Sequence, residues 1–244
     1  MRVGLYVTCL IDAMRPSIGF ATIRLLEAAG CVVIVPQAQT CCGQPGFNSG
    51  DRPTAQALAL KLLAEFESFD YVVIPSGSCA GMIRAHYPEL FQDDPAVLVR
   101  INALSQRTYE LTDFLTQVAK LEQLPGHFHG TLTYHDSCSG LRELGVQQQP
   151  RTLLAKMPGV TLKEMQESTT CCGFGGAFSV KFGELSSRMA DNKCNHIEAT
   201  DADAIVAGDL GCLLNIEGRL RRRGNHTTQI LHVAEVLAGP EKET

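Results

Sequence analysis

Short apolar runs alternate with segments of helical periodicity along the first third of the chain. Residues 3–8 form one such run, and residues 18–29 carry apolar positions at helical spacing that end at Gly30. The following run, CVVIVP at 31–36, is rich in β-branched residues and ends at a proline. This order of elements predicts a strand, a helix and a second strand, which together make one βαβ unit.

The same alternation continues through the rest of the sequence. Asp51 is a plausible N-cap with Pro53 in the first turn, and the helix it begins leads to the strand YVVIPS at 71–76. Later strands are predicted at TLTYHD (131–136), VTLKEM (160–165) and AIVAG (204–208), with helices at 151–156 and 183–199. Apolar strands that alternate with helices predict an α/β fold with parallel sheets covered on both faces.

Eight of the ten cysteines recur at a nearly constant offset, which is the signature of an internal repeat. The offset between corresponding cysteines is 129 to 133 residues. The first set is Cys9, Cys41, Cys42 and Cys79, and the second is Cys138, Cys171, Cys172 and Cys212. We therefore predict two pseudo-symmetric, Rossmann-like halves from a duplication: residues 1–125, including a connecting helix near 111–121, and residues 126–244.

The repeated cysteines follow predicted strands, so their chemistry can be inferred from the fold class. Functional groups of parallel sheets gather beyond the carboxyl ends of the strands, where four thiols of each half would converge. Thiolates bind soft metals, and adjacent cysteines suit a polynuclear cluster better than a single tetrahedral ion. This favours iron and sulfur, while zinc, thiol redox chemistry and plain burial remain alternatives.

Glycine and phenylalanine follow both cysteine pairs. Gly43 and Gly173 would let the backbone approach a cluster closely and adopt a positive φ angle. Phe174, in the same turn as Gly175, would belong to an apolar shell that limits water and tunes the potential. The stretch GFGGAF also resembles a dinucleotide-binding loop, but the third glycine of that fingerprint is absent.

The twofold arrangement of a cysteine, Cys-Cys-Gly and a further cysteine resembles the cysteine-rich CCG-domain family. That family includes the cysteine-rich subunit of heterodisulfide reductase and the iron-sulfur subunits of glycolate oxidase and anaerobic glycerol-3-phosphate dehydrogenase. Within it, the match is closest to the lactate-utilisation iron-sulfur proteins. The stretches that carry this resemblance are VTCLIDA, CCGQPGFNSGD, PSGSC, CCGFGGAFSVK, GCLLNIEGRL and HVAEVL.

The resemblance implies an iron-sulfur subunit that carries electrons in the oxidation of L-lactate to pyruvate. It also implies companion subunits, one of them a second iron-sulfur protein. The heterodisulfide reductase pattern ends in Cys-x-x-Cys, whereas here Ser76 and Asp209 stand at the first of those positions. Four thiols per half favour one [4Fe-4S] cluster in each repeat, with Ser76 and Asp209 as candidate oxygen ligands. Alternatives are a cluster-based thiol-disulfide reductase and a zinc-stabilised assembly protein.

Composition restricts the partners. A net charge of -5 provides no basic excess for nucleic acid, and no apolar run approaches the length of a membrane span. The N-terminal stretch has the pattern of a first strand and not of a signal peptide. A cysteine-rich chain without these signals is expected in the cytoplasm, where thiols stay reduced.

Four further features have structural interpretations that compete with functional ones. Cys31 and Cys194 lie outside the repeat and are expected to be buried core residues. His135 follows a strand, and we interpret it as a structural histidine or a residue near the cluster. The arginines of the segment 218–224 are expected at a solvated helix end, with a docking patch for an acidic redox partner as the alternative.

Overall fold

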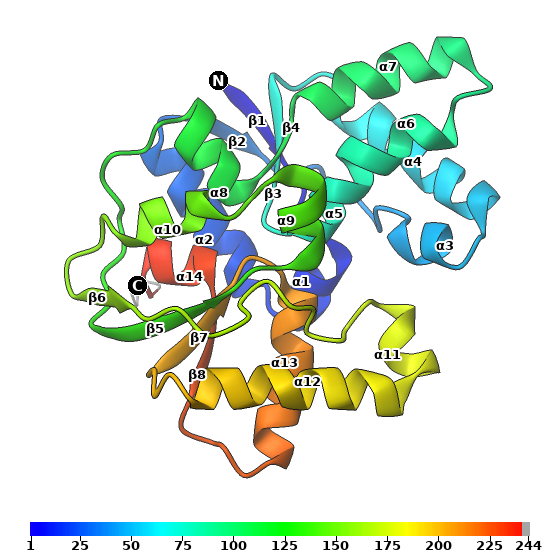
Figure 1. Cartoon of the computed structure of the whole chain (residues 1–244). Coiled ribbons are helices and arrows are strands. Elements are labelled where there is room, and N and C mark those ends of the chain that lie inside the picture. Colours follow the sequence, from blue (N-terminus) through cyan, green and yellow to red (C-terminus); the bar gives the residue numbers. More distant parts are fainter. Residues whose placement is uncertain (241–244) are drawn as a thin grey trace.

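The chain folds into two four-stranded, all-parallel sheets, and the computed structural model describes residues 1–240 (Figure 1). The strand orders are β2-β1-β3-β4 and β6-β5-β7-β8. The first sheet contains β1 (Arg2–Leu5), β2 (Val32–Ile34), β3 (Tyr71–Ile74) and β4 (Thr108–Glu110). The second contains β5 (Gly130–His135), β6 (Val160–Leu162), β7 (Ala204–Ala207) and β8 (Gln229–His232). The predicted α/β fold of two similar halves is confirmed.

Helices connect the strands of the first half. They are α1 (Cys9–Met14), α2 (Ser17–Ala28), α3 (Gln44–Asn48), α4 (Arg52–Phe66), α5 (Gly77–Gly81), the π-helical η1 (Met82–His86), α6 (Tyr87–Leu90), α7 (Pro95–Gln106), α8 (Leu111–Asp113) and the π-helical η2 (Phe114–Val118). Asp51 caps α4 as the sequence predicts, because its side chain accepts a hydrogen bond from the Thr54 amide at 3.2 Å.

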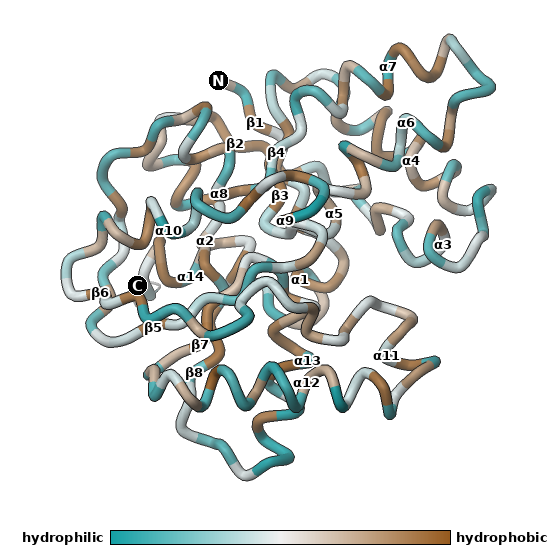
Figure 2. The backbone as a smooth tube through the Cα atoms, in the orientation of Figure 1, coloured by the Kyte–Doolittle hydropathy of each residue, from teal (hydrophilic) through white to brown (hydrophobic). Residues whose placement is uncertain are grey.

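The second half repeats this arrangement with fewer and partly longer helices. They are α9 (Cys138–Leu144), α10 (Gln148–Leu154), α11 (Ala177–Lys181), α12 (Gly183–Glu198), α13 (Leu210–Arg222) and α14 (Val233–Ala238). Figure 2 shows hydrophobic residues along β7 and hydrophilic residues along much of α12. Among residues 1–240, no helix combines the length and apolar character that a membrane span requires.

The fourth strand of each sheet is the part of the fold that the sequence pattern does not reveal. β4 and β8 are short and lie inside stretches interpreted as a connection or left unassigned. Their registers correspond, because Ile74 pairs with Glu110 in the first sheet and Ala207 pairs with His232 in the second. The stretch that joins the halves therefore contributes one strand, β4, to the first sheet.

The two halves exchange their last helices. α14 of the second half packs on α2 of the first, and α8 with η2 of the first half packs on α10 of the second (Figure 1). Arg15 fixes the first exchange by donating to Glu235 and to the Ile230 carbonyl, both at 2.9 Å. One hydrophobic core, which includes Leu25 and Leu237, therefore extends across both halves.

The second exchange begins at a buried carboxyl group. Glu110 is 2% exposed and caps α8 by accepting hydrogen bonds from the Thr112 and Asp113 amides at 2.7 and 3.1 Å. Burial disfavours the charged form and raises the pKa of Glu110 to about 7, although the hydrogen bonds from Thr112 and Asp113 oppose this shift.

Glu110→Gln should flatten the pH dependence of stability. Glu110 binds a proton more tightly in the folded chain, so its contribution is complete below about pH 4 and is lost as pH rises through 7. The substitution should therefore stabilise the protein at pH 8 relative to pH 5, by at most about 3 kcal/mol. Urea unfolding at both pH values measures this difference. A wild-type and variant difference that stays constant with pH would contradict it.

Candidate metal centres

The first four repeated cysteines lie together at the carboxyl edge of the first sheet. Cys9 begins α1, Cys41 and Cys42 lie in the loop after β2, and Cys79 lies in α5 after β3. The Sγ atoms of Cys42 and Cys79 are 3.5 Å apart, and the thiol of Cys41 lies close enough to those of Cys9 and Cys42 to shift their pKa values. The structure thus joins all four in one chain of contacts.

The second four form the same arrangement in the other half. Cys138 begins α9, Cys171 and Cys172 follow β6, and Cys212 lies in α13 after β7. Cys171 lies beside Cys138 and Cys172, and Cys172 lies beside Cys212, because each of these thiols shifts the pKa of its neighbour. The cysteines of both groups are free thiols. Each group can therefore offer four sulfur ligands from three separate loops.

Crowding of the thiols sets their charge. In the first group, hydrogen bonds from Cys42 and Cys9 lower the pKa of Cys41 far below its usual value. Hydrogen bonds to Cys41 and Cys79 raise the pKa of Cys42, with burial as a further cause. The second group shows the same pair of shifts at Cys171 and Cys172. A bound cation would favour the deprotonated form of all these thiols, because metal ligation requires thiolates.

Glycine is required at the turn that follows each cysteine pair. Gly43 and Gly173 have φ angles of +84° and +87°, which side chains rarely adopt. Their amides donate hydrogen bonds to the sulfur atoms of Cys41 and Cys171, both at 3.4 Å. A Cβ atom at position 173 would also lie 2.7 Å from the Ser186 carbonyl oxygen. The turn that aims the thiols therefore depends on glycine for two reasons.

The aromatic residue of the second turn, Phe174, lies beside the second group of thiols. The ring of Phe174 lies against Gly211, where a Cβ atom would approach it to 2.5 Å. Phe174 and Gly175 line the same hollow as Cys171, Cys172 and Cys212, together with side chains from the first half. The second centre is therefore enclosed by both halves of the chain.

His135 is the one buried side chain beside the thiols that lacks a partner among the described residues. It is fully buried, and neither ring nitrogen has a hydrogen-bond partner. One ligand atom each of His135, Cys172 and Cys212 lies within 4.8 Å of the others. An orphaned imidazole costs free energy unless something satisfies it, so a group held by these thiols fits the site.

At the equivalent position of the first half, the buried side chain has a hydrogen-bond partner. The pairing of Leu5 with Val73 in the first sheet corresponds to that of Tyr134 with Val206 in the second. Tyr6 therefore occupies the position in the first repeat that His135 occupies in the second. Tyr6 donates its hydroxyl hydrogen to the Thr40 carbonyl at 2.5 Å. The two centres therefore have equivalent sets of thiols but differ in the side chain beside them, which is Tyr6 in the first and His135 in the second.

Comparison with known proteins agrees with this geometry. The model of the CCG cysteine-rich domain matches residues 3–84 and 132–217, and each match contains one of the two cysteine groups. The chain belongs to the CCG family. Two curated CCG relatives are lactate utilization protein A from Geobacillus kaustophilus (strain HTA426) and from Bacillus velezensis (strain DSM 23117 / BGSC 10A6 / LMG 26770 / FZB42). They are 47% and 44% identical to this chain. Both alignments span 97% of this chain, and they span 98% and 99% of the two relatives, respectively.

A solved structure shows the same fold without close sequence similarity. The hypothetical protein from Helicobacter pylori superposes with a TM-score of 0.67 at 13% identity, over 99% of this chain. The chain spans about half of that protein, 49% of its length. This similarity concerns the fold alone.

Ser76 and Asp209, the candidate oxygen ligands, contact each other between the two CCG repeats. The Asp209 carboxylate accepts hydrogen bonds from the Ser78 amide at 2.8 Å and the Ser76 hydroxyl at 3.4 Å. Here α5 and α9 approach so closely that a Cβ atom on Gly77 would lie 2.9 Å from the Gly140 Cα atom. In this structure the two residues join the repeats.

The remaining candidates have structural roles in the CCG fold. Cys31 and Cys194 are buried in the hydrophobic core, as predicted. The arginine segment links two helices: Arg219 donates to Asp191 at 2.7 Å, and Arg223 donates to Glu198 at 2.7 Å. These ion pairs hold α13 against α12, so the segment has partners within the chain.

Gly173→Ala should destabilise the CCG fold more than Gly224→Ala. The φ angle of Gly224 is +86°, matching that of Gly173, but nothing lies within 4 Å of a Cβ atom there. We expect a loss of about 1 kcal/mol for the Gly224 variant and about 2 kcal/mol or more for the Gly173 variant. Urea unfolding of the two variants measures both. Equal losses would mean that the contact with Ser186 imposes no constraint.

Proposed function

We propose that the chain is an iron-sulfur electron carrier that takes part in lactate utilisation, with one [4Fe-4S] cluster in each repeat. The two groups of four thiols carry this proposal, because they converge from separate loops at equivalent strand ends. The relatives named lactate utilization protein A, aligned over almost their whole length, supply the metabolic context. The proposed ligands are Cys9, Cys41, Cys42 and Cys79 in the first centre, and Cys138, Cys171, Cys172 and Cys212 in the second.

The donor set favours iron and sulfur over zinc. Four thiolates also suit a structural zinc ion, but in that case every ligand must point at one atom. Neighbouring cysteines such as Cys41 and Cys42 leave the backbone in different directions, which suits several irons. Bound clusters would supply one-electron redox chemistry. The chain's own part is to hold them with thiolates, exclude water with Phe174 and the buried strand ends, and aim His135 at the second centre.

The proposed role divides lactate oxidation among several proteins. Oxidation of L-lactate to pyruvate releases two electrons and two protons, and two one-electron centres match the electron count. Companion lactate-utilisation subunits, including a second iron-sulfur protein, would perform the oxidation and exchange electrons with this chain. We place this activity in the cytoplasm, where the free thiols stay reduced.

Each cluster should depend on its own cysteine pair. Cys42→Ser and Cys172→Ser should each remove about half of the iron and sulfide from anaerobically purified protein, because each variant breaks one of two sites. Cys194→Ser is the matched control, since Cys194 is equally buried but lies outside both groups. Zinc without iron, or iron unaffected by either substitution, would overturn the proposal.

The two centres should also respond differently to changes beside them. His135→Phe should alter the EPR signal and the reduction potential of one centre, because it removes the imidazole from the second group of thiols. Tyr6→Phe, at the equivalent position, should leave both signals unchanged, since the Tyr6 hydroxyl is already used by Thr40. Nitrogen couplings detected by pulsed EPR and lost in the His135 variant would confirm the contact. Identical spectra for wild type and both variants would contradict it.

Lactate should be the electron source when the companion subunits are present. We expect L-lactate to reduce the clusters only in the combined system, and disulfide substrates to leave them oxidised. Visible absorption of the clusters under anaerobic conditions measures both reactions. Oxidation of the reduced clusters by a disulfide, without any response to lactate, would instead favour a thiol-disulfide reductase.

A further inference from the structure

A cavity of about 660 Å³ opens beside the first centre and next to Cys9 and Cys41. Its wall combines the ends of β1 and β2 with one face of α2, through Val7, Val35 and Ile23. Its volume lies within the range of small-molecule sites, roughly 300 to 1,000 Å³. Phe20 lines the cavity and remains 55% exposed, so an aromatic surface is available to an incoming ligand.

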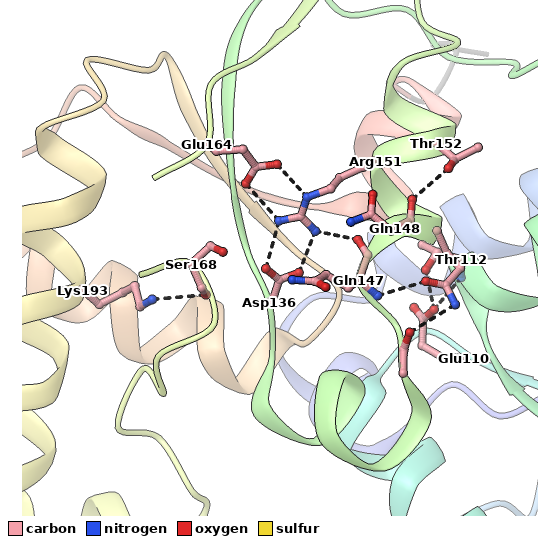
Figure 3. Close-up of polar contacts among 12 residues, drawn as sticks. Glu110, Thr112, Asp136, Gln147, Gln148, Arg151, Thr152, Glu164, Ser168 and Lys193 are labelled. Atoms are coloured by element: carbon pink, nitrogen blue, oxygen red, sulfur yellow. Dashed lines mark hydrogen bonds and ion pairs between the residues drawn. The ribbon is translucent and has the colours of Figure 1, made fainter. Parts of the chain in front are cut away.

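The second half carries charged side chains at the equivalent positions. The pair Arg2 and Val32 of the first sheet corresponds to the pair Thr131 and Thr161 of the second, so both strands align with a shift of 129 positions. With this shift, Val7 corresponds to Asp136 and Val35 to Glu164. Arg151, on α10, donates to Asp136 at 2.7 and 2.9 Å and to Glu164 at 2.6 and 2.9 Å (Figure 3). Beyond these strand ends, the second repeat therefore has an ion-pair network, whereas the first repeat has an open apolar wall.

The backbone just before the first cysteine of the repeat is strained in the first repeat and relaxed in the second. Thr8, which lines the cavity and precedes Cys9, has a φ angle of +73°. The corresponding Ser137, before Cys138, has a relaxed φ angle of -65° and caps α9. Positive φ in a β-branched residue is rare and occurs mostly at functional sites. The strain is an independent sign that this side of the first centre is built for binding.

The charges of the cavity identify the class of ligand. None of its lining residues is lysine, arginine or histidine, and Asp12 adds an acidic group. A carboxylate or phosphate would therefore meet no charged partner and one like charge, which disfavours lactate and nucleotides relative to an uncharged ligand. Apolar walls with amide and hydroxyl groups such as Gln37 and Thr40 suit an uncharged ring with carbonyl oxygens.

We propose that this cavity binds the ring of a neutral quinone. The inference deepens the proposed function, on which it rests, by naming the class of electron acceptor. Reduction of a quinone to the quinol consumes two electrons and two protons, the number that oxidation of lactate to pyruvate releases. The protons reach the quinone oxygens from solvent at the open mouth of the cavity.

Duroquinone tests the site directly, because its fully methylated ring resists addition of thiols. Anaerobic isothermal titration of the full chain should show saturable binding of one molecule per chain. Ile23→Trp, which fills the cavity without adding charge, should weaken binding at least tenfold. The triple variant Val7→Asp/Ile23→Arg/Val35→Glu should do the same, because it adds two carboxylates and a guanidinium group to the apolar wall of the cavity. Val99→Arg, on the exposed side of α7, controls for added charge and should keep the wild-type affinity.

Three outcomes would overturn the quinone site: no duroquinone binding, equal affinity in the filled variants that remain folded by thermal melting, or displacement of duroquinone by L-lactate. Iron and sulfide are measured on the same samples. Loaded clusters without duroquinone binding would reject this inference alone. Duroquinone binding to the cavity of a chain that never takes up iron would reject the proposed clusters and leave the binding site standing.

Discussion

Close packing between the two repeats is the constraint on which the rest of the structure depends. Gly77 and Gly140 bring α5 against α9 with no room for a side chain, and the buried Asp209 carboxylate is satisfied by Ser76 and Ser78 across the same contact. A buried carboxylate without such partners would be costly, so the donors fix the register of the two halves. Cys79 and Cys138 lie on these two helices, and the contact therefore positions a thiol of each centre.

The sequence reveals the parts of the fold that follow from local periodicity. Apolar runs and the cap at Asp51 predict the strands β1 and β3 and the start of α4, and the repeated cysteines predict which strand ends meet. The fourth strands escape detection because three or four residues carry no clear alternation, and their place is set by pairing with β3 and β7. Exchange of the last helices is also invisible locally, since it depends on contacts between residues more than 200 positions apart, such as Arg15 and Glu235.

The site shows the same division between local and tertiary information. Positive φ angles at Gly43 and Gly173 could be anticipated, because glycine follows each cysteine pair. The orphaned nitrogens of His135 could not, since they depend on which side chains fail to reach it in the folded core. Nor could the contact of Ser76 and Asp209 between the repeats, because the sequence only allows them as oxygen ligands and does not show that they meet. Nor could the open wall of the first repeat, because it depends on strand registers and helix positions that no local pattern specifies.

The exchanged helices suggest how such a chain could arise and why fusion mattered. If the repeats were separate molecules, α14 and α8 would be swapped arms that bind two copies into a symmetric dimer. In such a dimer, any mutation appears at both centres at once, so an open pocket and an ion-pair network could not occupy corresponding places. Joining the copies into one chain removes that restriction, and each centre becomes free to specialise. Tyr6 and His135 differ in this way, as do Val7 and Asp136: each pair descends from one ancestral position and has since diverged.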